Sequence, residues 1–162
     1  MDIIKIDGSS AGRVVPLIAA FRVTLRGYKG IASEPDLEQV KEEIEEFLDK
    51  GYPVYAAVQG ADTAGYVVCR TDGPCVWVEH IFVREEYRRR GIASLLFKQA
   101  EDLAARLGDD TVYNFVHPNN EGMIAFLRSR GYTVLNMLEI RRPWTGETPT
   151  AKVRVNDTEF DY

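Results

Sequence analysis

The stretch from Cys75 to Leu107 constrains the fold of this chain more than any other. Residues 75–83 form a run that is apolar on both faces apart from Glu79 and His80. A strand of this kind lies inside a sheet and is covered on both sides. Residues 92–107 then follow helical spacing, with apolar side chains at positions 92, 95, 96, 100, 103 and 107. The sequence therefore predicts a buried strand, a short loop and a long amphipathic helix.

The loop Arg88-Arg89-Arg90-Gly91-Ile92-Ala93 has the composition of an anion-binding turn. A glycine-containing turn that opens a helix directs several backbone N–H groups at one point, where the positive end of the helix dipole also acts. The main chain would hold a diphosphate there, and the arginines would add charge around it. Ser94, in the first turn, either adds a hydroxyl or only caps the helix. The alternative for the arginines is a solvated basic cluster or a nucleic-acid patch.

The remaining elements predict the fold class. A chain of 162 residues, 45% hydrophobic and 28% charged, can form an ordinary domain with a sizeable core. We expect an α/β (α+β) chain with a mixed central sheet flanked by helices. Helices are expected from Ser9 or Ser10 to about 26, at 36–50, in the long helix above and at 119–130. Strands are expected at 3–6, 53–59, 63–70, 75–84, 111–117, 132–142 and 151–155.

Charge and composition narrow the class of partner. The net charge of −5 argues against a nucleic-acid partner and is compatible with a cationic amine. No apolar run approaches the roughly 20 residues that span a bilayer, and the N-terminus lacks a secretory signal. A cytoplasmic location without a membrane partner is therefore expected. Cys69 and Cys75 are expected to be reduced thiols, and two cysteines with two distant histidines are too few for a metal site.

Two motifs resemble the GNAT N-acetyltransferase superfamily. Arg88, Gly91 and Ala93 match its acyl-CoA loop, Q/R-x-x-G-x-G/A, between a strand and a helix. The segment at 120–132 is similar to a second family pattern, N-x-x-A-I-x-L-Y-x-x-x-G-F, through Asn120, Ile124, Phe126 and Gly131-Tyr132. The resemblance covers roughly residues 2–142. It implies one GNAT domain over 1–142, followed by a C-terminal extension over 143–162 that is free, forms a strand or contacts a second copy in a homodimer.

The resemblance implies acetyl-CoA as co-substrate, with its diphosphate on the loop. In this family the central strand separates from its neighbour, which frees backbone N–H groups for the acetyl carbonyl and the pantetheine arm. Asn120 matches a residue that contacts that arm, although it could equally cap a helix. No metal is implied. The implied cofactor-binding residues are Ile81, Phe82, Val83, Arg88, Arg89, Arg90, Gly91, Ile92, Ala93, Ser94 and Asn120.

Glu79 resembles the family's general base toward the amine, which often acts through water. The alternative is a solvated or salt-bridged carboxylate at a strand edge. For His80 we expect a satisfied core or supporting histidine. The chain departs from the family at Leu127, where a tyrosine is often proposed as general acid. Other donors remain open, namely Tyr132, Tyr113, His117 or water.

The resemblance implies an N-acetyltransferase that moves the acetyl group of acetyl-CoA to a primary amine by direct attack. The alternative, which Leu127 motivates, is an acyl-CoA-binding sensor or regulatory domain without efficient catalysis. In this fold the first two helices, their loop and the last two strands shape the acceptor pocket. The sequence does not name the acceptor, and candidate residues for its pocket are Tyr28, Glu34, Trp77 and Trp144.

Overall fold

The structure, a computed structural model, describes residues 1–162 and divides them into two compact units. The first unit contains Met1–Arg22 and Pro35–Phe115. The second contains Val23–Glu34 and Val116–Tyr162. Each unit is described by itself below.

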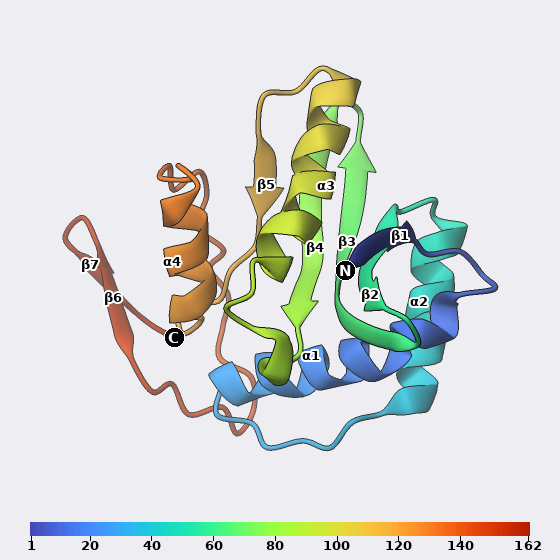
Figure 1. Cartoon of the computed structure of the whole chain (residues 1–162). Coiled ribbons are helices and arrows are strands. Elements are labelled where there is room, and N and C mark those ends of the chain that lie inside the picture. The colour runs from blue at the N-terminus through green and yellow to red at the C-terminus, as the bar shows by residue number, and fades with distance from the viewer. The chain divides into compact units, whose positions relative to one another are not determined.

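A five-stranded sheet forms the frame of the first unit (Figure 1). Its order is β1-β2-β3-β4-β5, and every neighbouring pair is antiparallel except β4 and β5, which run parallel. Gly60, at φ 62°, lies in the turn between β2 and β3, and Gly73, at φ 58°, lies in the turn between β3 and β4. The strands are β1 (Asp2–Lys5), β2 (Val54–Gln59), β3 (Asp62–Asp72), β4 (Cys75–Val83) and β5 (Val112–Asn114).

Helices cover both faces of this sheet. One face is covered by the short helix η1 (Ala11–Arg13), α1 (Val15–Tyr28) and α2 (Leu37–Asp49). These helices form a core with alternate residues of β2 and β3, namely Val54, Ala56, Val58, Tyr66 and Val68. A second short helix, η2 (Glu85–Tyr87), leads to α3 (Ile92–Leu107), which packs on β2, β3 and β4. The residues of α3 lie outside that core cluster, and its Leu96 reaches Gly65, whose neighbour Tyr66 points to the other face. The predicted mixed sheet flanked by helices is confirmed.

The second unit contains the end of α1, the helix α4 (Glu121–Ser129) and a hairpin of β6 (Lys152–Val155) and β7 (Thr158–Asp161). The side chain of Asn120 caps α4, because its Oδ1 accepts the Met123 N–H at 3.1 Å. Backbone hydrogen bonds between Ala151 and Tyr162 close the open end of the hairpin. None of the chain's helices has the length and apolar character needed to cross a bilayer.

The predicted strand over residues 132–142 is wrong, because this segment forms no ladder with any other strand. Its high content of apolar and β-branched residues is typical of a strand, but a strand exists only where its backbone groups pair. The apolar side chains of the segment are instead exposed, between 47% for Leu138 and 86% for Val134. The strand expected at 111–117 also shortens to β5.

The start of the first helix also differs from the prediction. Neither Ser9 nor Ser10 caps it with a side chain, and α1 begins only at Val15. The carboxylate of Asp7 is the stronger acceptor here, since its Oδ1 takes the backbone N–H groups of Ser9 at 3.0 Å and Ser10 at 3.1 Å. The second helix matches expectation, because Asp36 caps α2 by accepting the Gln39 N–H at 3.0 Å.

Gly65 marks the closest approach between α3 and the sheet. A Cβ atom at this position would lie 2.7 Å from the carbonyl oxygen of Phe82 and 3.1 Å from side-chain atoms of Leu96 and Val83. Backbone cannot move away cheaply, so any side chain here overpacks the contact. The absence of a side chain at Gly65 therefore lets α3 pack closely on β3 beside β4.

We predict that Gly65→Ala lowers the free energy of unfolding by about 1–3 kcal/mol, the usual cost of overpacking. The matched control is Gly27→Ala in α1, where a Cβ would meet nothing within 4 Å. Removing a helical glycine should leave stability unchanged or raise it by up to about 1 kcal/mol. Urea denaturation of both variants checks this, and equal effects would contradict it.

Candidate functional site

A β-bulge places Glu79 at the centre of the first unit's sheet. Val68 pairs with His80 and Cys69 with Val78, so Glu79 is an extra residue on β4 with no partner opposite it. Its Oε1 lies 2.5 Å from Nε of Arg70 on β3, and each side chain is 26% exposed. The salt-bridged arrangement foreseen as an alternative for Glu79 is therefore present. The hydrogen bond with Glu79 also raises the pKa of Arg70.

β4 and β5 pair over only part of their length. The pairing joins Val76–Val78 to Val112–Asn114, whereas β4 continues to Val83 (Figure 1). After Val78, the edge of β4 that faces away from β3 therefore has no strand beside it. This is the strand separation that the family resemblance implies.

The free edge presents main-chain groups of Ile81 and Val83 and not those of Phe82. The Arg84 N–H points toward β3, because it donates to the carbonyl oxygen of Ala64 at 2.9 Å. Backbone groups of successive residues point to opposite edges of a strand. Phe82, two residues before Arg84, therefore directs its N–H and C=O groups toward β3 as well, where its register partner is Tyr66. Those of Ile81 and Val83 point to the opposite edge. The main chain of Phe82 therefore faces β3, whereas the predicted ligand-binding groups of Ile81 and Val83 lie on the free edge.

The loop that follows β4 folds back onto this edge. Nε of Arg88 donates to the carbonyl oxygen of Val83 at 3.0 Å, so part of the Arg88 side chain fixes the loop instead of facing a ligand. Arg89 and Gly91 both adopt left-handed backbone conformations, with φ 61° and φ 78°. A non-glycine residue at positive φ is unusual and costs about 1–3 kcal/mol where it occurs in a strained loop.

The loop ends in the first turn of α3, where several unpaired backbone N–H groups lie close together. The first four N–H groups of an α-helix have no partner inside the helix, and here they belong to residues 91–94. Gly91 leaves open space, since a Cβ at this position would meet nothing within 4 Å. Arg89 and Arg90 are exposed beside it, and the Arg90 guanidinium lies 5.5 Å from the Tyr87 ring centroid. A turn of this kind can bind an anion. Glu79 and the free edge lie on the same strand, β4.

A buried polar network supports β4 from the helical side. The His80 side chain is 5% exposed; its Nδ1 lies 3.2 Å from the Tyr66 hydroxyl and its Nε2 lies 3.4 Å from Oε1 of Glu43 on α2. Arg22 on α1 donates to both oxygens of Glu43, one of them through Nε at 3.0 Å. The rings of Phe21 and Phe47 flank the imidazole at 4.6 and 5.2 Å.

The network determines the protonation of His80. The carboxylate oxygens of Glu43 accept from Arg22 and also accept from His80, so Nε2 of His80 carries the proton. Nδ1 then accepts from the Tyr66 hydroxyl. Burial, aided by Arg22, lowers the pKa of His80 to about 3. His80 is therefore the neutral, satisfied core histidine that the sequence led us to expect.

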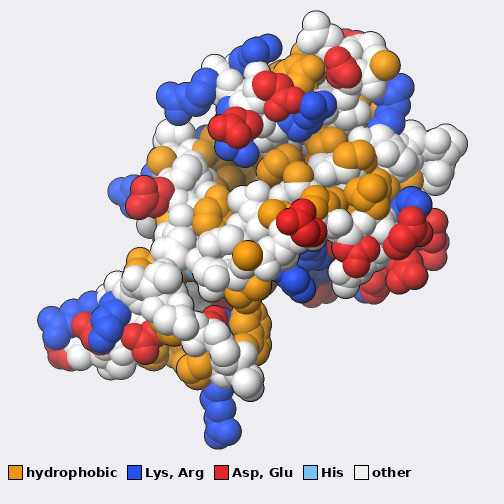
Figure 2. All heavy atoms as spheres, turned by 90° about the horizontal axis from the view of Figure 1, so that it is seen from below, with side chains coloured by type: hydrophobic (Ala, Val, Ile, Leu, Met, Phe, Trp, Pro, Cys, Tyr) orange, Lys and Arg blue, Asp and Glu red, His pale blue; other side chains and the backbone are white.

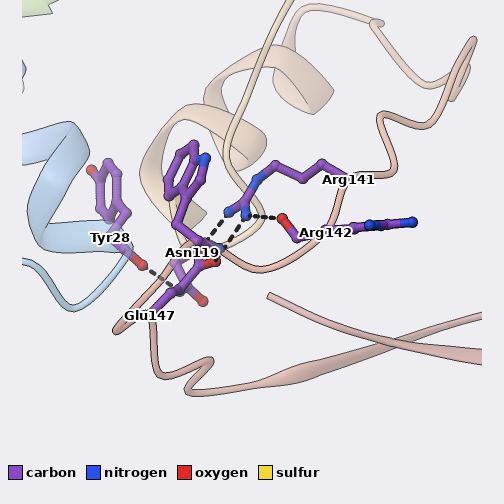
Figure 3. Close-up of polar contacts among 6 residues, drawn as sticks. Tyr28, Asn119, Arg141, Arg142 and Glu147 are labelled. Atoms are coloured by element: carbon purple, nitrogen blue, oxygen red, sulfur yellow. Dashed lines mark hydrogen bonds and ion pairs between the residues drawn. The ribbon is translucent and has the colours of Figure 1, made fainter.

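The second unit contains a separate cluster at the end of α1 and in the C-terminal segment (Figure 3). Arg141 and Glu147 form a two-point ion pair at 2.8 and 2.5 Å, and Glu147 also accepts the Trp144 N–H at 2.9 Å. These bonds, that of Arg141 first, lower the pKa of Glu147 to about 2. The Trp144 ring lies 3.7 Å from the Arg141 guanidinium and 4.4 Å from Nζ of Lys29.

Of the residues in and beside this cluster, the sequence analysis points only to Tyr28, His117 and Trp144. Arg141 and Glu147 are six residues apart across Pro143, a spacing that belongs to no regular element, so no periodic signal points to them. The Tyr28 ring stacks on His117 at 5.9 Å, and the Tyr28 carbonyl accepts from Asn119 at 2.8 Å.

Leu127 and Asn120, which the sequence singles out, have structural roles. Leu127 is 8% exposed and therefore buried. Asn120 uses its carboxamide oxygen to cap α4, which is the alternative foreseen for it. Glu34, a candidate for the acceptor pocket, is exposed.

Neither the acidic surface nor the two cysteines form a second candidate site. The acidic side chains that gather at the right of Figure 2 lie over α2, whose exposed acids are Glu38, Glu42, Glu45, Glu46 and Asp49. Both cysteines are free, and burial raises the pKa of Cys69 to about 12, so that thiol stays protonated. The structure brings no three His, Cys, Asp or Glu side chains together as a metal-binding group.

Comparison with known proteins places this geometry in a family. Residues 19–132 match the model of the Acetyltransferase (GNAT) family. Among solved structures, AAC(6')-Iy in complex with a bisubstrate analogue, CoA-S-monomethyl-acetylneamine, has a TM-score of 0.68 at 17% identity over 88% of this chain and 97% of that one. A ribosomal-protein-alanine N-acetyltransferase from Brucella melitensis has the same score and identity over 88% and 99% of the two chains. An aminoglycoside 6'-N-acetyltransferase from Acinetobacter haemolyticus also scores 0.68 at 17% identity, over 89% and 99%.

We predict that His80 makes the fold sensitive to acid. Unfolded His80 takes up a proton below about pH 6.5, whereas folded His80 stays neutral down to a pKa of about 3. Between these values the unfolded state binds more protons, so the free energy of unfolding should fall by up to about 1.4 kcal/mol per pH unit as pH decreases.

Urea denaturation between pH 7 and pH 4 measures this slope. His80→Gln retains a donor for Glu43 and an acceptor for Tyr66 but cannot titrate, so its slope should be shallower by up to that amount. Equal slopes in the two proteins would show that His80 does not carry the effect.

Proposed function

The chain belongs to the Acetyltransferase (GNAT) family, and on this basis we propose that it transfers the acetyl group of acetyl-CoA to a primary amine. The observation that carries the proposal is the free edge of β4, which begins after Val78 and leads directly into the loop and the first turn of α3. Acetyl-CoA needs hydrogen-bond donors for its thioester carbonyl and for its diphosphate. The segment from the end of β4 to the first turn of α3 contains backbone N–H groups for both.

The diphosphate would bind the N–H groups of residues 91–94, with Arg89 and Arg90 adding positive charge. The pantetheine arm would then run along the edge of β4. Its thioester oxygen would accept hydrogen bonds from the main chain of Ile81 or Val83, which stabilise the negative charge that develops on that oxygen.

The transfer step requires a neutral amine. An alkylammonium with a pKa near that of lysine, about 10.4, must first lose a proton, and Glu79 is the proposed acceptor, directly or through water. The amine nitrogen then bonds to the carbonyl carbon, and the resulting intermediate collapses with cleavage of the carbon–sulfur bond. CoA leaves as a thiolate that takes up a proton, and the nitrogen of the product loses its extra proton to give the amide.

Leu127 supports a second candidate, an acyl-CoA-binding sensor with little catalysis. A buried leucine cannot protonate the departing thiolate, and general acid help is typically worth about 10²- to 10⁴-fold. A thiol of pKa about 8.5 is nevertheless a fair leaving group without such help. The similar solved structures, by their names, act on acceptors as different as an aminoglycoside and a ribosomal protein, so the fold does not choose the acceptor.

The direct test is release of the CoA thiol from acetyl-CoA in the presence of primary amines: polyamines, aminoglycosides, arylalkylamines, amino acids and short peptides. Release that depends on an amine supports the transferase. Tight binding of acetyl-CoA with no release for any amine would favour the sensor.

We predict that Arg89→Glu weakens acetyl-CoA binding about tenfold or more, because it places a negative charge beside the diphosphate. The matched control is Arg106→Glu, which reverses an exposed charge in the last turn of the same helix. Isothermal titration calorimetry compares the two. Equal losses of affinity would show that the diphosphate does not sit at the first turn of α3.

We predict that Glu79→Gln lowers kcat about 10²- to 10⁴-fold, the usual contribution of a general base. Glutamine keeps an acceptor for Arg70, so acetyl-CoA affinity should not change. Glu86→Gln, which alters an exposed carboxylate paired with Arg84, is the control and should retain full activity. An unchanged kcat for Glu79→Gln would assign the base to another group.

A further inference from the structure

A row of stacked side chains stands beside Glu79 in the first unit. The Arg70 guanidinium, which pairs with Glu79, lies 5.0 Å from the Trp77 ring centroid. Trp77 stacks on Tyr113 at 4.7 Å with 27° between the rings, and on Phe115 at 4.9 Å with 18°. We call Arg70, Trp77, Tyr113 and Phe115 the aromatic row. Because Arg70 touches both Glu79 and Trp77, the row and the carboxylate lie on the same face of the sheet.

We propose that the aromatic row is a wall of the acceptor pocket and selects amines carried on a flat aromatic body. This inference rests on the proposed acetyl transfer and names the acceptor class for it. Tyr113 lies opposite Trp77 in the last paired stretch of β4 and β5, and Phe115 lies just beyond the end of β5. The row therefore borders the point where the free edge of β4 begins, the edge proposed to hold the acetyl group.

The side chains of the aromatic row are packed against one another and are partly exposed to solvent. Trp77 and Tyr113 are half-buried, whereas Phe115 is 59% exposed although it stacks on Trp77. Single exposed apolar side chains are common. A continuous set of parallel rings, exposed at the end that borders the free edge, instead offers a surface onto which another ring can stack.

An acceptor stacked on this wall would place its amine near Glu79. Arg70 pairs with Glu79 and offsets part of its charge, and the carboxylates of Asp72 and Asp109 also act electrostatically on Arg70 and Tyr113. A single ammonium group on a short arm could reach Glu79 while its ring lies against Phe115. Phenethylamine has this shape, and cyclohexylethylamine matches its size and charge without an aromatic ring.

The test measures the binding and acetylation of these two amines by the protein with CoA or acetyl-CoA. Stacking between aromatic rings corresponds to about twofold to tenfold in affinity, so phenethylamine should bind and be acetylated with that preference. Phe115→Leu keeps an apolar side chain but removes the ring, and should abolish the preference mainly through KM. Phe160→Leu, on the β6–β7 hairpin, should retain it.

The outcomes separate the two proposals. Equal binding of both amines, or a preference that survives Phe115→Leu, overturns the aromatic row as a selector. A preference in binding that Phe115→Leu removes, without acetylation of any amine, keeps the row as a ligand site and overturns the transferase.

Discussion

The early end of the pairing between β4 and β5 is the constraint on which the site depends. Three residue pairs join the strands, and β4 then continues for five residues with one edge free. Buried backbone groups normally find partners, so an unpaired edge inside a sheet is a place where another molecule can complete the hydrogen bonding. Arg88 already uses one such group, the carbonyl of Val83, to hold the loop against the strand.

Two devices hold β4 in this position. The bulge at Glu79 inserts one residue and turns its carboxylate to Arg70, which in turn lies over Trp77. On the helical side, the chain of contacts from Arg22 through Glu43 to His80 and Tyr66 joins α1 and α2 to β4 and β3. In both arrangements the polar groups have hydrogen-bond or ion-pair partners, so no charged group is left unpaired in the sheet.

The local motif could be predicted from sequence because its signals are periodic. The apolar run of β4, the glycine in the loop and the helical spacing of α3 each have one simple structural meaning, and they agree with one another.

The features that could not be predicted depend on partners that a sequence does not specify. Residues 132–142 are rich in apolar side chains, as a strand often is, yet pair with no strand, and the side on which Phe82 presents its backbone follows from the register with β3. The ion pair of Glu79 with Arg70 arises from a bulge, and that of Arg141 with Glu147 from an irregular segment. Glu79 and the loop residues remain predictions as functional groups, although the structure gives each a place.

The most direct measurement is amide hydrogen exchange at single-residue resolution, with and without acetyl-CoA. The amides of Ile81 and Val83 should exchange fast in the free protein, whereas that of Phe82, which faces β3, should be protected. Acetyl-CoA should slow the exchange of Ile81 or Val83, together with residues 91–94, by tenfold or more. Protection of all three β4 amides in the free protein, or no change at this edge when acetyl-CoA binds, would contradict the account.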